Sequence, residues 1–112
     1  MKIYHNPRCR KSRETLALIV DAGRGVEIIE YLKNVPSKEE LEGLLEKLGI
    51  EPEQIIRKSE KEYKENYKGK TLSASEWIEA MVAHPKLIER PIVVKEDKAI
   101  LGRPPQNVLK LL

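Results

Sequence analysis

The 112-residue sequence has one cysteine, no phenylalanine and no long apolar stretch. A single cysteine cannot form an internal disulfide, and a structural zinc site lacks ligands because only His5 and His84 accompany Cys9. The longest uninterrupted apolar run is Leu16–Val20, whereas a membrane span requires about 18 residues. These absences predict no metal site, no membrane span and a thiol without a partner thiol in its own chain.

The composition that is present favours one compact domain over residues 1–112. Hydrophobic residues make up 40% of the chain and charged residues 35%, which is enough for one core beneath a charged surface. The 21 basic and 18 acidic residues leave a net charge of +3, without a basic stripe interleaved with aromatics, so nucleic acid is not an expected partner. The N-terminal segment has no apolar signal-peptide region, so we expect a cytoplasmic protein.

The first part of the sequence has the pattern of a β-α-β unit. Lys2–Tyr4 favours a short strand that stops at an Asn-Pro turn. A helix is predicted over 10–22, with Leu16, Ile19 and Val20 on its apolar side. The β-branched run 26–29 predicts a second strand, and a short helical crossover places it parallel to the first.

A helical insertion is predicted at about 35–85. Ser37-x-x-Glu40 and Ser73-x-x-Glu76 are capping-box patterns, each followed by apolar residues at helical spacing. The first of these helices ends at Gly49. A further short helix is expected over 53–58, and 59–70 has the composition of a solvated loop or frayed helix.

The last third returns to strands. Runs 91–94 and 99–101 flank a short polar loop and predict an antiparallel hairpin, and a final helix is expected with Val108, Leu109, Leu111 and Leu112 on its apolar side. The resulting order is a β-α-β half, a helical insertion and a β-β-α half. The sequence therefore predicts an α/β, thioredoxin-like fold, with a four-stranded mixed sheet and flanking helices.

Cys9 falls where the first strand has ended and the first helix begins. Helix N-terminal N–H groups and nearby positive charge favour the thiolate, which is the reactive form of cysteine. The basic residues near Cys9 in the sequence are Arg8, Arg10, Lys11 and Arg13. His5 is also close in the sequence. The alternative is an inert, buried thiol, which is the common state of an isolated intracellular cysteine.

Three distant arginines are candidates for completing an anion site with Cys9. Arg57 lies near the end of a predicted helix, Arg90 directly precedes Pro91, and Arg103 directly follows the hairpin. In a thioredoxin-like fold the segment before the third strand lies beside the active-site turn, and its X-Pro bond is often cis, so Arg90-Pro91 is a candidate. Each arginine, taken singly, also fits a solvated surface cation.

Residues 5–13 match the HNPxCxxSR signature of the glutaredoxin-dependent arsenate reductase family. The segments around Arg57, Arg90 and Arg103 resemble the later arginine motifs of that family, in the same order along the chain. The resemblance implies a thioredoxin-like fold, with Cys9 as the catalytic thiol and these arginines as the oxyanion-binding triad. It also gives supporting roles to His5, Asn6, Ser12 and Arg13.

The resemblance further implies a reaction and its partners. The cysteine thiolate attacks arsenate, glutathione attacks the adduct as co-substrate, and glutaredoxin resolves the mixed disulfide as arsenite leaves; no cofactor is bound. Because Ser12 stands where a Cys-x-x-Cys motif has its second cysteine, the resolving thiol has to come from outside the chain.

Two alternatives remain at this point. Spx-type transcription regulators share the fold and bind RNA polymerase, although they commonly carry the Cys-x-x-Cys switch that this chain lacks. The family also includes short chromosomal members whose substrate is unsettled, so glutathione-dependent reduction of a different substrate is the second alternative.

Overall fold

The computed structural model describes all 112 residues, which fall into two compact units. Unit 1 comprises Met1–Asn34 and Arg90–Leu112, and unit 2 comprises Val35–Glu89. Unit 2 begins where the helical insertion was predicted to begin and extends slightly past the predicted end at residue 85. That residues 1–112 act as a single domain stays a prediction.

Unit 1 contains a four-stranded mixed sheet in the order β2-β1-β3-β4. The strands are β1 (Lys2–His5), β2 (Glu27–Glu30), β3 (Ile92–Lys95) and β4 (Lys98–Leu101). Strand β1 pairs in parallel with β2 and antiparallel with β3, and β3 and β4 form an antiparallel hairpin. The predicted parallel pair and the hairpin are therefore confirmed, and β1 lies in the interior of the sheet.

Helix α1 (Arg10–Asp21) connects the two parallel strands. Its buried residues are Ser12, Thr15 and Ile19, which share one face. The prediction that Val20 belongs to this apolar side is wrong, because Val20 lies about 100° further round the helix and is 57% exposed. Two of the three buried positions are polar, and their hydroxyl groups make hydrogen bonds near the first turn.

The C-terminal segment is a 3-10 helix, η3 (Pro105–Leu111), rather than the ordinary helix that we predicted. Its buried residues, Pro105, Val108 and Leu111, recur every three positions, which is the repeat of a 3-10 helix. Leu109 does not join the apolar side, because it is 53% exposed. The buried face of this segment therefore repeats every three residues, as in a 3-10 helix, and not every 3.6 residues, as in an α-helix.

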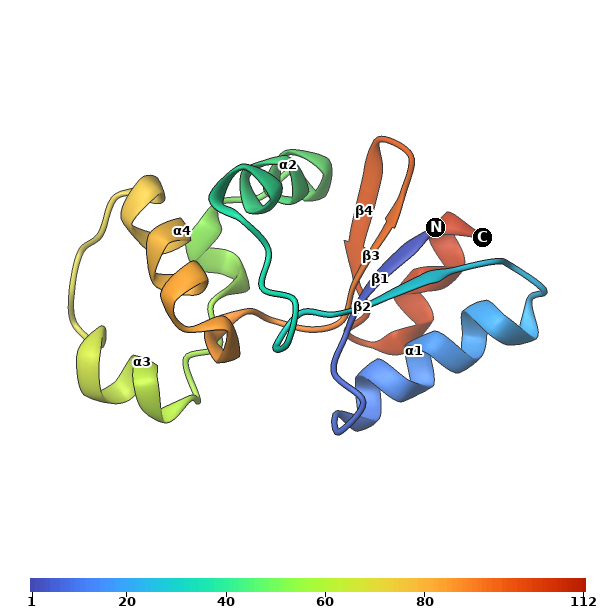
Figure 1. Cartoon of the computed structure of the whole chain (residues 1–112), viewed down its shortest axis with the longest axis horizontal. Helices are drawn as coiled ribbons and strands as arrows, with labels where there is room; N and C mark the ends of the chain where they lie inside the picture. Colours follow the sequence, from blue (N-terminus) through green and yellow to red (C-terminus); the bar gives the residue numbers. More distant parts are fainter. The chain divides into compact units, whose positions relative to one another are not determined.

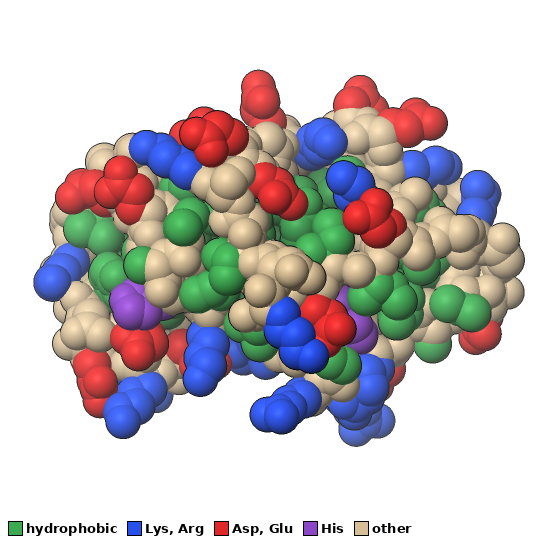
Figure 2. All heavy atoms as spheres, in the orientation of Figure 1, with side chains coloured by type: hydrophobic (Ala, Val, Ile, Leu, Met, Phe, Trp, Pro, Cys, Tyr) green, Lys and Arg blue, Asp and Glu red, His purple; other side chains and the backbone are tan.

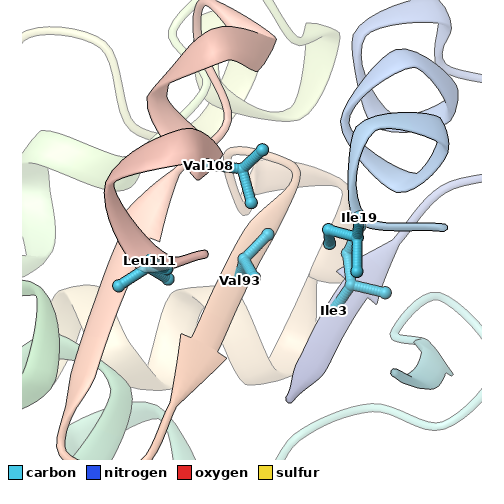
Figure 3. Packing of buried hydrophobic residues seen from close by; sticks show 5 residues of the cluster. All are labelled: Ile3, Ile19, Val93, Val108 and Leu111. Atoms are coloured by element: carbon cyan, nitrogen blue, oxygen red, sulfur yellow. The ribbon is translucent and has the colours of Figure 1, made fainter. Parts of the chain in front are cut away.

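The core of unit 1 lies between α1, η3 and one face of the sheet. Figure 3 shows Ile3 and Val93 on neighbouring strands, Ile19 on α1, and Val108 and Leu111 on η3 pointing toward one another. Four of the five side chains are fully buried. Ile19 lies in the C-terminal half of α1, so this packing holds that half of the helix against the sheet.

Unit 2 is helical (Figure 1). It contains α2 (Lys38–Leu48), η1 (Pro52–Ile55), α3 (Lys61–Asn66), α4 (Ala74–Ala83) and η2 (Pro85–Leu87). Ser37 and Ser73 each accept the backbone N–H three residues on, which confirms both predicted helix starts. Gly49 ends α2 in the left-handed conformation, with φ 71°, also as predicted.

Helix α3 occupies part of the segment that we expected to be a loop or frayed helix. It buries no residue of its own. Tyr63 stacks on Trp77 of α4 with ring centroids 6.4 Å apart, and Tyr67, the C-cap residue, lies 6.0 Å from the same indole. Ring contacts with Trp77 therefore contribute to holding this short helix.

No helix in the structure has both the length and the apolar character needed to cross a membrane.

Candidate active site

Cys9 is the N-cap residue of α1, immediately after the turn that ends β1. The turn is closed by two bonds to Asn6: its carbonyl accepts the Cys9 N–H at 2.9 Å, and its side-chain oxygen accepts the Arg8 N–H at 3.0 Å. The Cys9 carbonyl accepts the Arg13 N–H, which begins the helix. The predicted placement of Cys9 at a strand-to-helix turn is thus confirmed.

The surroundings of Cys9 favour its thiolate. The residue is only 9% exposed, and burial by itself raises the pKa of the thiol. Hydrogen bonds from the Arg90 side chain and from the Ser12 and Lys11 backbone N–H groups, together with the charge of Arg90, outweigh burial, and the net shift of the Cys9 pKa is downward. The thiol is buried, as the alternative to a reactive cysteine supposed, but its contacts stabilise the charged form.

Two arginines from the far end of the chain meet at this sulfur. Arg90 hydrogen-bonds to the thiol through its side chain, and Arg103 Nη2 lies 3.9 Å from Cys9 Sγ. Arg103 Nε donates to the Arg90 main-chain oxygen at 2.8 Å, so the two arginines are also linked to each other. Both precede cis prolines, Arg90-Pro91 and Arg103-Pro104, and the first is the bond that the sequence suggested.

A buried hydrogen-bond network lies beneath the turn. Ser12 is fully buried, and its Oγ lies 2.6 Å from His5 Nδ1 and accepts the Asn6 N–H at 3.1 Å. Burial lowers the pKa of His5, the Glu30 carboxylate raises it, and the charge of Arg13 lowers it, with a net downward shift. The Ser12 hydroxyl carries one proton and two lone pairs, so it can bond to His5 Nδ1 in either tautomer of the imidazole while accepting the Asn6 N–H.

The basic residues of the turn differ in their contacts. Arg10 pairs with Glu14 at 2.8 Å, and Arg13 Nη1 donates to the Pro7 carbonyl at 3.0 Å. Arg8 and Lys11 are exposed. Figure 2 shows Lys and Arg side chains around the β1–α1 connection, at the lower right of the view. Positive charge thus adjoins the candidate nucleophile on its solvent side.

Arg57, the third candidate arginine, belongs to unit 2. Its guanidinium pairs with Glu60, and its Nε lies 3.5 Å from Glu89 Oε1. The Arg57 N–H donates to the Leu87 carbonyl at 2.7 Å, beside the bridge between Ile56 and Ile88. These bonds fix Arg57 within its unit, and its approach to Cys9 stays a prediction.

The structure contains two site features that the sequence analysis missed. A Cβ atom added to Gly102 would meet Thr15 and Pro91 at less than 3 Å. Asn107 donates from its amide to the carbonyls of Leu101 and Arg103. The Gly102 contacts join positions far apart in the sequence, so no local pattern indicates them, and Asn107 belongs to none of the motifs considered above.

The sheet order, the helix on the parallel pair and the cysteine at the strand-to-helix turn define a thioredoxin-like protein with a candidate reactive thiol. The model of the ArsC family matches residues 4–111, and the chain belongs to that family. Two curated relatives are each 46% identical to the chain. One is the uncharacterized protein YfgD of Escherichia coli K12, with 100% of this chain and 96% of YfgD aligned. The other is an arsenate reductase of Haemophilus influenzae, with 98% and 97% aligned.

A solved structure supports the same relationship. The arsenate reductase from Vibrio cholerae superposes with a TM-score of 0.95 at 49% identity, and the alignment covers 100% of this chain and 98% of that one. The fold class and the family expected from the sequence are therefore confirmed.

Proposed function

We propose that this protein reduces arsenate to arsenite through a covalent adduct on Cys9. The observation that carries the proposal is the sulfur itself: its pKa is lowered, and the guanidinium groups of Arg90 and Arg103 lie beside it. A thiolate next to two permanent cations can attack an oxyanion, and guanidinium N–H groups match the oxygens of a tetrahedral anion. Relatives named arsenate reductases, 46% and 38% identical, support arsenate as that oxyanion.

The proposed first step is a condensation. The Cys9 sulfur bonds to arsenic(V), one arsenate oxygen leaves as water after taking up protons, and the arsenic keeps its oxidation state. Arg90 and Arg103 stabilise the charge on the remaining oxygens. We assign Arg57 to the same role, which completes the arginine triad implied by the family signature.

The proposed second step is the reduction. Glutathione attacks the Cys9 sulfur of the adduct, and the electron pair of the S–As bond passes to arsenic, which leaves as arsenite. The two thiols become a Cys9–glutathione disulfide, so two sulfurs lose the two electrons that arsenic gains. Glutaredoxin then removes the glutathionyl group and restores the Cys9 thiol. The chain has no second cysteine for this task, and we place the reaction in the cytoplasm, where glutathione keeps thiols reduced.

The supporting residues have positioning roles in this proposal. His5, Asn6 and Ser12 fix the turn that presents Cys9, and Arg13 ties α1 to the Pro7 carbonyl. None of them is required to exchange a proton with the substrate.

A coupled assay tests the function. Purified protein, arsenate, glutathione and glutaredoxin should yield arsenite, and omission of either thiol component should stop turnover. Cys9→Ser should abolish activity. The matched control is Cys9→Ser combined with Ser59→Cys, which keeps one thiol per chain at an exposed position of unit 2 and should also be inactive.

The outcomes separate the parts of the proposal. Arsenite formation no greater than that of Cys9→Ser would overturn arsenate as the substrate. Turnover that needs glutathione but not glutaredoxin would remove only the glutaredoxin step.

A further inference from the structure

Arg103 follows a glycine that is held from three directions. The Gly102 N–H donates to the Pro91 carbonyl at 2.9 Å. A Cβ on Gly102 would lie 2.5 Å from Thr15 Oγ1 and 2.7 Å from Pro91 Cγ, so any larger residue has to displace the Thr15 side chain and the Pro91 ring. Asn107 Nδ2 donates to the carbonyls on both sides of this glycine, those of Leu101 at 3.2 Å and Arg103 at 3.0 Å.

The Asn107 amide acts differently from an ordinary helix cap. A cap accepts backbone N–H groups at the start of a helix, whereas Asn107 lies inside η3 and donates to the chain that enters it. Asn107 therefore links η3 to the backbone of Arg103. The neighbouring Val108 is fully buried, so the backbone that carries the Asn107 side chain is held in place by core packing.

The position of the Arg103 guanidinium depends on this support. Its Nε donates to the Arg90 carbonyl, and its Nη2 lies 3.9 Å from Cys9 Sγ. With these two contacts made, the Arg103 side chain has little conformational freedom as long as the Arg103 backbone is fixed. It can leave the sulfur if the Arg103 carbonyl is released, and the link to Arg90 means that the second arginine is disturbed as well.

We propose that Asn107 and Gly102 are positioning residues that hold Arg103, and through it Arg90, against the Cys9 sulfur and its oxyanion substrate. The substrate part of this inference rests on the function proposed above. The geometric part concerns only the arginines and the thiol and can be tested without arsenate.

The test compares Asn107→Leu, which keeps the approximate shape and removes both donors, with Gln106→Leu, which changes an exposed neighbour on the same 3-10 helix. The first readout is the apparent pKa of Cys9 from alkylation rate against pH. The second is KM and kcat for arsenate in the coupled assay. We expect Asn107→Leu to raise the thiol pKa and to increase KM about tenfold with a smaller change in kcat, because displaced groups bind the oxyanion poorly. Gln106→Leu should match the wild type.

Two further variants keep the proposal testable if Asn107→Leu folds poorly. Asn107→Gln retains an amide donor and should recover part of the loss. Gly102→Ala pushes Thr15 or Pro91 aside and should shift both readouts in the same direction as Asn107→Leu.

The results distinguish this inference from the proposed function. A folded Asn107→Leu or Gly102→Ala protein with unchanged thiol pKa and unchanged KM would overturn the inference, even if its melting temperature fell. If the wild type produces no arsenite but Asn107→Leu still raises the thiol pKa, the positioning role stands and the arsenate proposal fails.

Discussion

Replacing Ser12 with alanine removes the centre of the buried network beneath the active-site turn. The Ser12 Oγ lies 2.6 Å from His5 Nδ1 and accepts the Asn6 N–H at 3.1 Å, and the residue is fully buried. The variant leaves two buried polar groups without this partner, each at a cost of about 1–3 kcal/mol. We expect a loss of roughly 2–6 kcal/mol in the free energy of unfolding, a large share of the ~5–15 kcal/mol of a typical domain.

Denaturant unfolding and thermal melting measure this loss. For a chain of this size about 1 kcal/mol corresponds to about 4 °C, so the melting temperature should fall by roughly 8–24 °C. Ser59→Ala is the matched control, because Ser59 is exposed, and it should change stability by less than about 0.5 kcal/mol. A Ser12→Ala protein as stable as the control would refute the reasoning, since it would mean that His5 and Asn6 do not depend on the hydroxyl.

Two other predictions concern charge at the turn. Arg8 and Lys11 are exposed beside Cys9, and their positive charge should attract an anionic reagent. Replacing both with glutamine should lower the ratio of the alkylation rate by anionic iodoacetate to that by neutral iodoacetamide about 2- to 5-fold at low salt. A ratio that changes neither with salt nor with the substitutions would contradict this prediction. Burial sets the His5 pKa below its ordinary value of 6.5, so the unfolded chain binds more protons between the folded pKa and 6.5. Stability should then fall as the pH is lowered through that interval. Unfolding followed against pH should show this slope in the wild type and in His84→Gln but not in His5→Gln.

The parts of the fold that could be predicted from the sequence are those governed by local chemistry. The Ser37 and Ser73 caps each depend on a hydroxyl and a backbone N–H three residues apart. The position of Cys9 as N-cap follows from an Asn-Pro turn directly before an amphipathic helix. Such signals are complete within a few residues, so the sequence alone contains them.

The features that could not be predicted depend on distant partners. Tyr63 meets Trp77 only after the chain between them has folded back, so α3 had no visible reason to form. The apolar residues near the C-terminus fit either helical repeat, and packing on the sheet selects the one that buries Val108 with Leu111. Gly102 allows a close approach of Thr15, a contact between positions far apart in the sequence.

The candidate site divides in the same way. The three arginines could be proposed from the sequence through their motifs. Which of them contact the Cys9 sulfur could not be predicted. The structure places Arg90 and Arg103 at Cys9 and links the two to each other. It accounts for Arg57 by contacts within its own unit.

The most direct test of the account is the apparent pKa of the Cys9 thiol, measured from the rate of iodoacetamide alkylation against pH in the wild type and in Arg90→Gln. We predict a wild-type value well below the about 8.5 of a free cysteine. The value should rise in Arg90→Gln, because the substitution removes the hydrogen bond and the positive charge that lower the Cys9 pKa. A wild-type value of about 8.5 or higher, or the same value in both proteins, would contradict the claim that arginine contacts hold Cys9 as a reactive thiolate.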